Sequence, residues 1–154
     1  DGSLIYPKKE TEILTLEEIR RKLLEYTVGC IYSLCNWEFD ELAYRDIKML
    51  LLDAQAHGTK TLIVMTPYQP WVLNRFSELS AYQEILPAVR GAIATRMVQE
   101  AGVSFAFCDA LDPATSGCME TEFMDGMHMQ RYCAEKVMRK CLGRLDETLL
   151  SPQL

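Results

Sequence analysis

The sequence predicts a single α/β domain over residues 1–154, in which a mainly parallel sheet lies between two layers of helices. The first observation is a helix–glycine–strand rhythm that occurs twice, in AQAHGTKTLIVM and in VQEAGVSFAF. Such alternation is typical of right-handed crossovers between parallel strands. The second observation is composition: 154 residues with 49% hydrophobic and 25% charged side chains are enough for one compact core.

The first helix is expected to follow an irregular or extended lead-in over residues 1–14. Thr15 and Glu18 have the spacing of a capping box, in which each residue satisfies an unpaired backbone donor of the other. Four apolar side chains then fall on one face of the helix: Leu16, Ile19, Leu23 and Leu24. The apolar run GCIYSLC, residues 29–35, is either a short strand or an irregular buried segment.

A stronger helix is predicted over residues 40–57, and Gly58 suits the position just past its end. Its buried side is expected to carry Leu42, Ile47, Leu50, Leu51 and Ala54. The continuous apolar run LIVM, residues 62–65, predicts a strand that is covered on both faces.

The second half of the chain repeats this order. A helix is predicted over residues 82–101, with Pro87 as an internal start or kink, and Gly102 closes it. The strand VSFAF, residues 103–107, follows, and a loop rich in small and acidic residues leads to a last helix over residues 129–142. In open parallel sheets, functional groups gather beyond the carboxyl ends of the strands. The loops TPYQPW and CDALDP…FMDGMH leave these ends, so we expect them at the same edge of the sheet.

Charge and hydropathy exclude several classes of partner. The net charge is −6 and the isoelectric point is near 5.0, which argues against nucleic acid or an anionic membrane as the main partner. No apolar run reaches the length needed to span a bilayer. The six cysteines follow no tight framework, so free and partly buried thiols are expected, and these slightly favour a reducing, cytoplasmic compartment.

Asp125 and His128 are the candidate catalytic pair. A hydrolytic histidine takes a proton from a nucleophile and passes it to a leaving group, and a carboxylate fixes its tautomer. A spacing of three residues in a turn before a helix lets one loop supply both groups, and Gly126 permits a tight bend. A structural alternative is that Asp125 caps the last helix while His128 packs at its start.

The order of these features resembles the C-terminal part of the SGNH (GDSL-type) hydrolase superfamily. The strand VSFAF is followed by an acidic loop, the block F-x-D-G-x-H and a final helix. DGSLIYP and LIVMTPYQP are also similar to the later two-thirds of bacterial SGNH-like proteins that modify cell-surface polysaccharides or acyl groups. The resemblance implies a flavodoxin-like three-layer fold, His128 as general base and Asp125 as its orienting partner. It also implies an acylated carbohydrate or similar ester as substrate, and a location in the cell envelope.

The nucleophile block of that family is absent. The chain contains no Gly-Asp-Ser, and Asp1-Gly2-Ser3 has a different order and no strand before it. Ser3 is therefore not assigned as the nucleophile. Two explanations remain open: the chain is the C-terminal fragment of a serine ester hydrolase or acyl transferase, or it is a non-catalytic α/β domain that binds a partner or a glycan through the same edge.

Tyr68, Gln69 and Trp71 are the candidate substrate-binding residues. They lie in the loop TPYQPW, which prolines stiffen on both sides of Tyr68 and Gln69. Stiff aromatic loops suit sugar or acyl-chain binding. The equally good alternative is that Trp71 only covers the edge of the sheet.

A zinc-stabilised interaction domain is the third hypothesis. Its ligands would be Cys108, Cys118, His128 and Cys133. Their spacing contains no Cys-x-x-Cys pair, so we expect no metal and no cofactor. A small-molecule or carbohydrate ester is the expected partner, and a homo-oligomer is compatible with the sequence.

Overall fold

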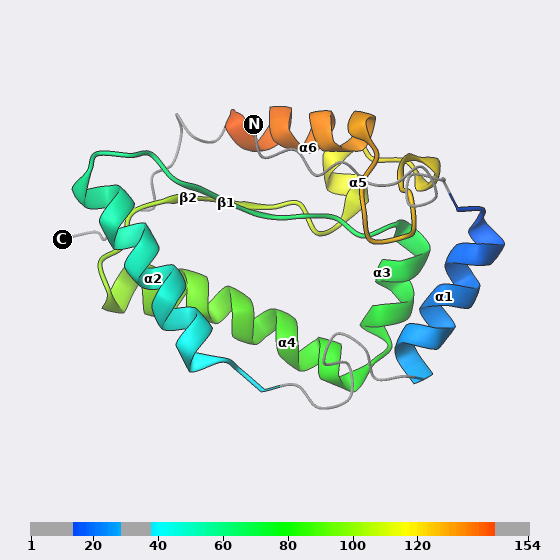
Figure 1. The fold of residues 1–154 in the computed structure, drawn as a ribbon, viewed down its shortest axis with the longest axis horizontal. Coiled ribbons are helices and arrows are strands. Elements are labelled where there is room, and N and C mark those ends of the chain that lie inside the picture. Colours follow the sequence, from blue (N-terminus) through cyan, green and yellow to red (C-terminus); the bar gives the residue numbers. More distant parts are fainter. Residues whose placement is uncertain (1–13, 29–37, 144–154) are drawn as a thin grey trace.

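Helices lie on both faces of a two-stranded parallel sheet in the computed structural model of the chain, which describes residues 14–28 and 38–143 (Figure 1). The elements in chain order are α1 (Leu16–Val28), α2 (Glu41–Ala56), β1 (Leu62–Met65), α3 (Pro70–Ser77), α4 (Ser80–Gly91), the π-helix η3 (Ala92–Glu100), β2 (Ala106–Asp109), α5 (Pro113–Ser116), the 3-10 helix η4 (Glu120–Glu122) and α6 (Arg131–Leu142). The predicted lead-in, apart from Leu14, and the possible strand at 29–35 lie outside the described residues.

The two strands run parallel, as predicted from the repeated rhythm. Leu62 pairs with Ala106, and the register continues to Met65 and Asp109. β2 starts three residues later than the predicted strand at 103–107. Before it, Val103 and Phe105 are fully buried in a cluster with residues of α2 and η3, and the paired register with β1 begins at Ala106.

Successive side chains of each strand point to opposite faces of the sheet and pack against different helices. Ile63 and Phe107 pack in a cluster with α2 and η3. Val64 and Cys108 face the opposite side and pack against α6. Figure 1 shows the same arrangement, with α6 above the strands and α2 and α4 below them. The α/β class of the fold and the parallel pairing are therefore confirmed.

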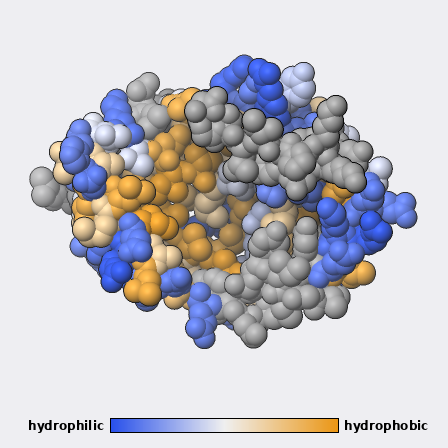
Figure 2. All heavy atoms as spheres, viewed as in Figure 1, coloured by the Kyte–Doolittle hydropathy of each residue, from blue (hydrophilic) through white to orange (hydrophobic). Residues whose placement is uncertain are grey.

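The buried side of α2 differs from the prediction. Tyr44 and Leu51 enter the core, whereas Leu42 is 63% and Leu50 68% exposed. Ile47 is exposed as well, and Ala54 is half-buried. No part of the described chain packs over this side of α2, so its apolar residues stay at the surface, where Figure 2 shows apolar side chains gathered over α2.

The predicted helix over 82–101 is two helices in series. α4 contains Pro87, which therefore does not start it, and the hydrogen bonding changes to the wider π pattern from Ala92 onward. Gly102 follows with a positive φ of 66° and turns the chain toward β2. Ile93 and Met97 of η3 are buried against α2.

α1 and α3 form a third cluster with the start of α4. Its buried members are Ile19, Val72, Phe76 and Tyr82. The predicted capping box at α1 is confirmed, because the Thr15 amide donates to Glu18 Oε2 at 2.8 Å and the Glu18 amide donates to Thr15 Oγ1 at 3.3 Å. Within residues 14–28 and 38–143, no helix has the length and apolar character needed to cross a bilayer.

The expectation of free thiols is wrong for the described cysteines. Cys108 at the end of β2 is bonded to Cys141 of α6, and Cys118 is bonded to Cys133 at the other end of α6. The partners lie 33 and 15 residues apart, so only the packing of α6 on the sheet brings them together, and connectivity of this kind cannot be read from a sequence. The reason to favour a reducing compartment is therefore lost. Cys30 and Cys35 lie outside the described residues.

Candidate functional site

Asp125 and His128 form a direct hydrogen bond at the carboxyl end of the sheet. Oδ2 of Asp125 lies 2.7 Å from Nδ1 of His128. The side chain of His128 is 63% exposed and that of Asp125 is 28% exposed. Among the described residues, Nε2 of His128 has no hydrogen-bond partner. The expected contact through Nδ1 is present, and the second ring nitrogen is open to another molecule.

The second carboxylate oxygen of Asp125 is also held. Oδ1 accepts the backbone N–H of Met127 at 3.1 Å and that of His128 at 2.9 Å. Partial burial acts to raise the pKa of Asp125, but the hydrogen bond to the His128 side chain and the two backbone donors outweigh it, and the net result is a lowered pKa. Asp125 is therefore a fixed, ionised acceptor near neutral pH.

The loop that carries the pair is closed on itself. Phe123 and Met129 form an antiparallel bridge, and the Met124 amide donates to the His128 carbonyl at 2.8 Å. Gly126 stands at the turn with a φ of 86°, a conformation that favours glycine. The expected role of Gly126 in a tight bend is confirmed.

Two neighbouring segments anchor this loop. The Gln69 amide donates to the carbonyl of Gly126 at 2.8 Å, and the Leu14 amide donates to that of Met124 at 2.8 Å. Gly126 itself is packed so tightly that a Cβ at this position would lie 2.7 Å from Val72 Cγ2 of α3. The loops after β1 and β2 therefore meet at one edge, as the parallel order predicts.

The three predicted substrate-binding residues take different positions beside this loop. Gln69 is fully buried: its Oε1 caps α3 by accepting the Val72 amide at 3.1 Å, and its Nε2 donates to Glu120 Oε1 at 2.9 Å. Tyr68 is half-buried and packs edge-on against Phe76. Trp71 is half-buried and lies under the guanidinium of Arg20, 5.4 Å from the ring centroid. Gln69 is thus a structural residue in this state, while Tyr68 and Trp71 keep exposed surface.

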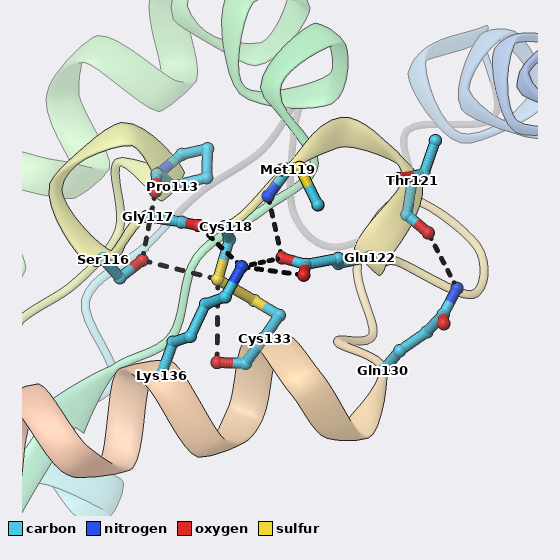
Figure 3. A network of polar contacts seen from close by, with 10 residues as sticks. All are labelled: Pro113, Ser116, Gly117, Cys118, Met119, Thr121, Glu122, Gln130, Cys133 and Lys136. Atoms are coloured by element: carbon cyan, nitrogen blue, oxygen red, sulfur yellow. Dashed lines mark hydrogen bonds and ion pairs between the residues drawn. A yellow bond between two sulfur atoms is a disulfide. The ribbon is translucent and has the colours of Figure 1, made fainter.

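A polar network that the sequence does not signal holds the segment before the pair (Figure 3). The ammonium of Lys136 lies 2.7 Å and 2.8 Å from the two carboxylate oxygens of Glu122, and it also donates to the Gly117 carbonyl at 2.9 Å. Hydrogen bonds from Lys136 and from the Met119 amide lower the pKa of Glu122. The disulfide between Cys118 and Cys133 lies beside this network and encloses the whole segment that includes Asp125 and His128.

The disulfides also bear on the zinc hypothesis. Three of its four candidate ligands, Cys108, Cys118 and Cys133, are bonded to other sulfurs and have no thiolate to offer. Nδ1 of His128 is already hydrogen-bonded to Oδ2 of Asp125. Within the described part of the chain, no three histidine, cysteine or acidic side chains are grouped as metal ligands would be.

The cavities among the described residues include one between α3 and α4, one beside α6 and one beside α2, and His128 lines none of these three. No family model, no curated protein and no solved structure matches the chain. The chemistry of the site is therefore inferred from its geometry.

Proposed function

We propose that the chain supplies the base and orienting carboxylate of an SGNH-like serine ester hydrolase or acyl transferase, which acts on an acylated carbohydrate or a similar ester. The observation that carries this proposal is the 2.7 Å contact between Asp125 Oδ2 and His128 Nδ1, with Nε2 open. A carboxylate on Nδ1 fixes the tautomer in which Nε2 is the basic nitrogen. The helices on both faces of the parallel sheet also agree with the three-layer architecture of that superfamily.

The reaction needs a serine that is brought to Nε2 of His128. Nε2 takes the proton of the serine hydroxyl while the serine oxygen attacks the ester carbonyl carbon. The protonated imidazole then gives this proton to the leaving alkoxide, and the ionised Asp125 stabilises the imidazolium in between. Water or an acceptor hydroxyl attacks the acyl-serine in the same way, and the serine is regenerated. Within the described residues, no serine is hydrogen-bonded to His128, so this mechanism takes its nucleophile from outside the described residues.

The disulfides favour an oxidising location for this activity. Two bonds, Cys108–Cys141 and Cys118–Cys133, fasten α6 to the sheet and to the loop of the pair. Disulfides persist mainly in secreted, periplasmic or cell-surface proteins. Such a location is where surface polysaccharides and their esters are exposed, and it agrees with the cell-envelope expectation.

A fluorophosphonate probe tests the proposal, because it reacts only with an activated serine. We expect the natural protein, expressed from its complete coding sequence, to be labelled on one serine, and His128→Ala to abolish the labelling. The matched control is His57→Ala: the only other histidine, it also contacts an acidic residue, with Nδ1 3.5 Å from Asp53 Oδ1, and it lies at the end of α2. Unchanged labelling of His128→Ala would reject the catalytic role, and the non-catalytic binding domain would then be the better account.

A further inference from the structure

A cavity of about 760 Å³ opens between α3 and α4, beside the carboxyl end of β2. Its walls include Leu73 and Asn74 of α3, Leu86 of α4, and Asp109 at the end of β2. This volume lies within the range of ligand sites, and the end of a parallel strand is the place where open α/β sheets bind ligands. The cavity shares α3 with the Asp125–His128 loop, because the first turn of α3 holds Gly126 and the next turns line the cavity.

A buried hydroxyl without a partner belongs to this cavity. Tyr82 lines it, is only 5% exposed, and packs its ring against Phe76. Its hydroxyl oxygen has no hydrogen-bond partner among the described residues, which is uncommon for a buried polar group. Burial raises the pKa of Tyr82, so the phenol stays neutral and can both donate and accept. In this structure the oxygen itself is enclosed, so a ligand hydroxyl would pair with it only after the Tyr82 ring turns toward the cavity.

The charges of the wall disfavour an anion. The one cation of the wall, Arg90, is paired with Asp109, whose Oδ2 lies 2.8 Å from Nε and 2.6 Å from Nη2. Asp112 also lines the cavity and adds a second carboxylate, so one positive charge stands against two negative charges. An anionic ligand would meet net repulsion here, whereas a neutral ligand would not.

The same wall offers polar groups beside apolar ones. Pro87 has no N–H to donate to the carbonyl of Gln83 one turn earlier, so this helical hydrogen bond is missing in the part of α4 that lines the cavity. The amide of Asn74 and the hydroxyl of Thr115 lie at the exposed part of the wall. Leu73 and Leu86 supply apolar surface. Mixed donors, acceptors and apolar patches suit a sugar, which carries hydroxyls around a ring with C–H faces.

We propose that this cavity binds a neutral carbohydrate unit, the sugar part of the ester that the Asp125–His128 pair acts on. The proposal rests on the proposed function for its substrate class, and it places the sugar along α3 and α4, next to the pair rather than on it. The Arg90–Asp109 pair and Tyr82 would receive its hydroxyls.

Titration of the ¹⁵N-labelled chain with three neutral disaccharides, cellobiose, maltose and N,N′-diacetylchitobiose, tests this proposal by NMR. We expect at least one of them to shift the amide signals of Asn74, Gln83 and Leu111. Asn74→Trp would fill the cavity from the exposed side of α3 and should weaken binding at least about tenfold. Asn74→Ala is the milder second variant, and the exposed Gln99→Ala on η3 is the control that should bind normally.

The outcomes separate the two proposals. No shift with any of the three sugars, shifts that map away from the cavity, or binding that survives Asn74→Trp in a folded protein would overturn the carbohydrate site. Preferential binding of digalacturonate, an anionic disaccharide, would overturn it as well. His128→Ala should leave sugar binding intact. Sugar binding without serine labelling of the natural protein would reject the catalytic proposal alone, and labelling without sugar binding would reject the cavity alone.

Discussion

Gln69 donates its backbone N–H to the carbonyl of Gly126 at 2.8 Å and so joins the loop after β1 to the loop that carries Asp125 and His128. Both loops leave the same edge of the sheet because β1 and β2 are parallel. The geometry of the pair therefore depends on residues that are distant in the sequence and do not touch a substrate.

Gly126→Ala should destabilise the fold by about 2–4 kcal/mol, because it combines backbone strain with overpacking. The φ of 86° disfavours a side chain, and a Cβ would lie 2.7 Å from Val72 Cγ2 and 2.9 Å from Ile19 Cγ2. Gly117→Ala is the matched control: its φ is 72°, but a Cβ there meets nothing within 4 Å, so it should cost only about 1 kcal/mol. Urea unfolding of both variants measures the difference. Equal losses would show that the contact with α1 and α3 does not matter.

Gln69→Ala should lower the free energy of unfolding by about 1–3 kcal/mol, since it removes a cap and leaves a buried space. Gln69 is fully buried, and both ends of its side-chain amide are engaged. Gln99→Ala, at an exposed position, should change stability by less than about 0.5 kcal/mol. If Gln69→Ala left stability unchanged and altered only substrate binding, the predicted contact of Gln69 with substrate would be correct after all.

Lowering the pH should reduce the free energy of unfolding, because Glu122 and Asp125 become protonated. Their folded pKa values are lowered, so their stabilising contributions are complete above the unfolded pKa values of about 4 and are lost as the pH falls through the folded values. Stability should therefore drop between about pH 5 and pH 3. Glu122→Gln should flatten this drop, while Glu84→Gln, at an exposed position of α4, should not. Urea unfolding at several pH values across that range measures the free energy of unfolding. If it fell equally steeply with pH in Glu122→Gln and in the unmodified protein, Glu122 would not contribute to the acid sensitivity.

The fold and the site were predictable from the sequence to different degrees. The repeated order of helix, glycine and strand predicts the parallel pair β1 and β2, because few topologies satisfy it. The contact between Asp125 and His128 was also predicted, because a spacing of three residues lets one loop bring both side chains together.

Features that depend on distant packing were not predictable. The Cys108–Cys141 and Cys118–Cys133 bonds require α6 to lie on the sheet, which no local pattern shows. The exposure of Leu42 and Leu50 arises because periodicity marks an apolar face but does not say what covers it. Gln69 looked like a surface ligand-binding residue because its loop leaves the sheet edge, yet α3 encloses it.

Loss of the Cys118–Cys133 bond should lower stability by about 3 kcal/mol, as estimated for a closed loop of this length. The loop includes Asp125 and His128, so Cys118→Ser with Cys133→Ser should also broaden the amide signals of residues 124–128. Cys108→Ser with Cys141→Ser is the comparison: its loop also contains residues 124–128, but it spans 33 residues and the bond itself joins β2 to the far end of α6, so the 124–128 signals should stay sharp. Peptide mapping without reductant first checks that both bonds form. Free thiols at all four positions in the natural protein would contradict the oxidising location.

The most direct test of the central claim is the kcat of the natural protein on an acetylated sugar, measured for Asp125→Asn. An amide at this position can hold His128 in the wrong tautomer, so kcat should fall by roughly 10⁴-fold while the protein stays folded at the assay temperature. Asp53→Asn alters the other aspartate–histidine contact, at the end of α2, and should leave kcat unchanged. A kcat for Asp125→Asn within about tenfold of the unmodified protein would show that the Asp125–His128 pair is not part of a catalytic triad.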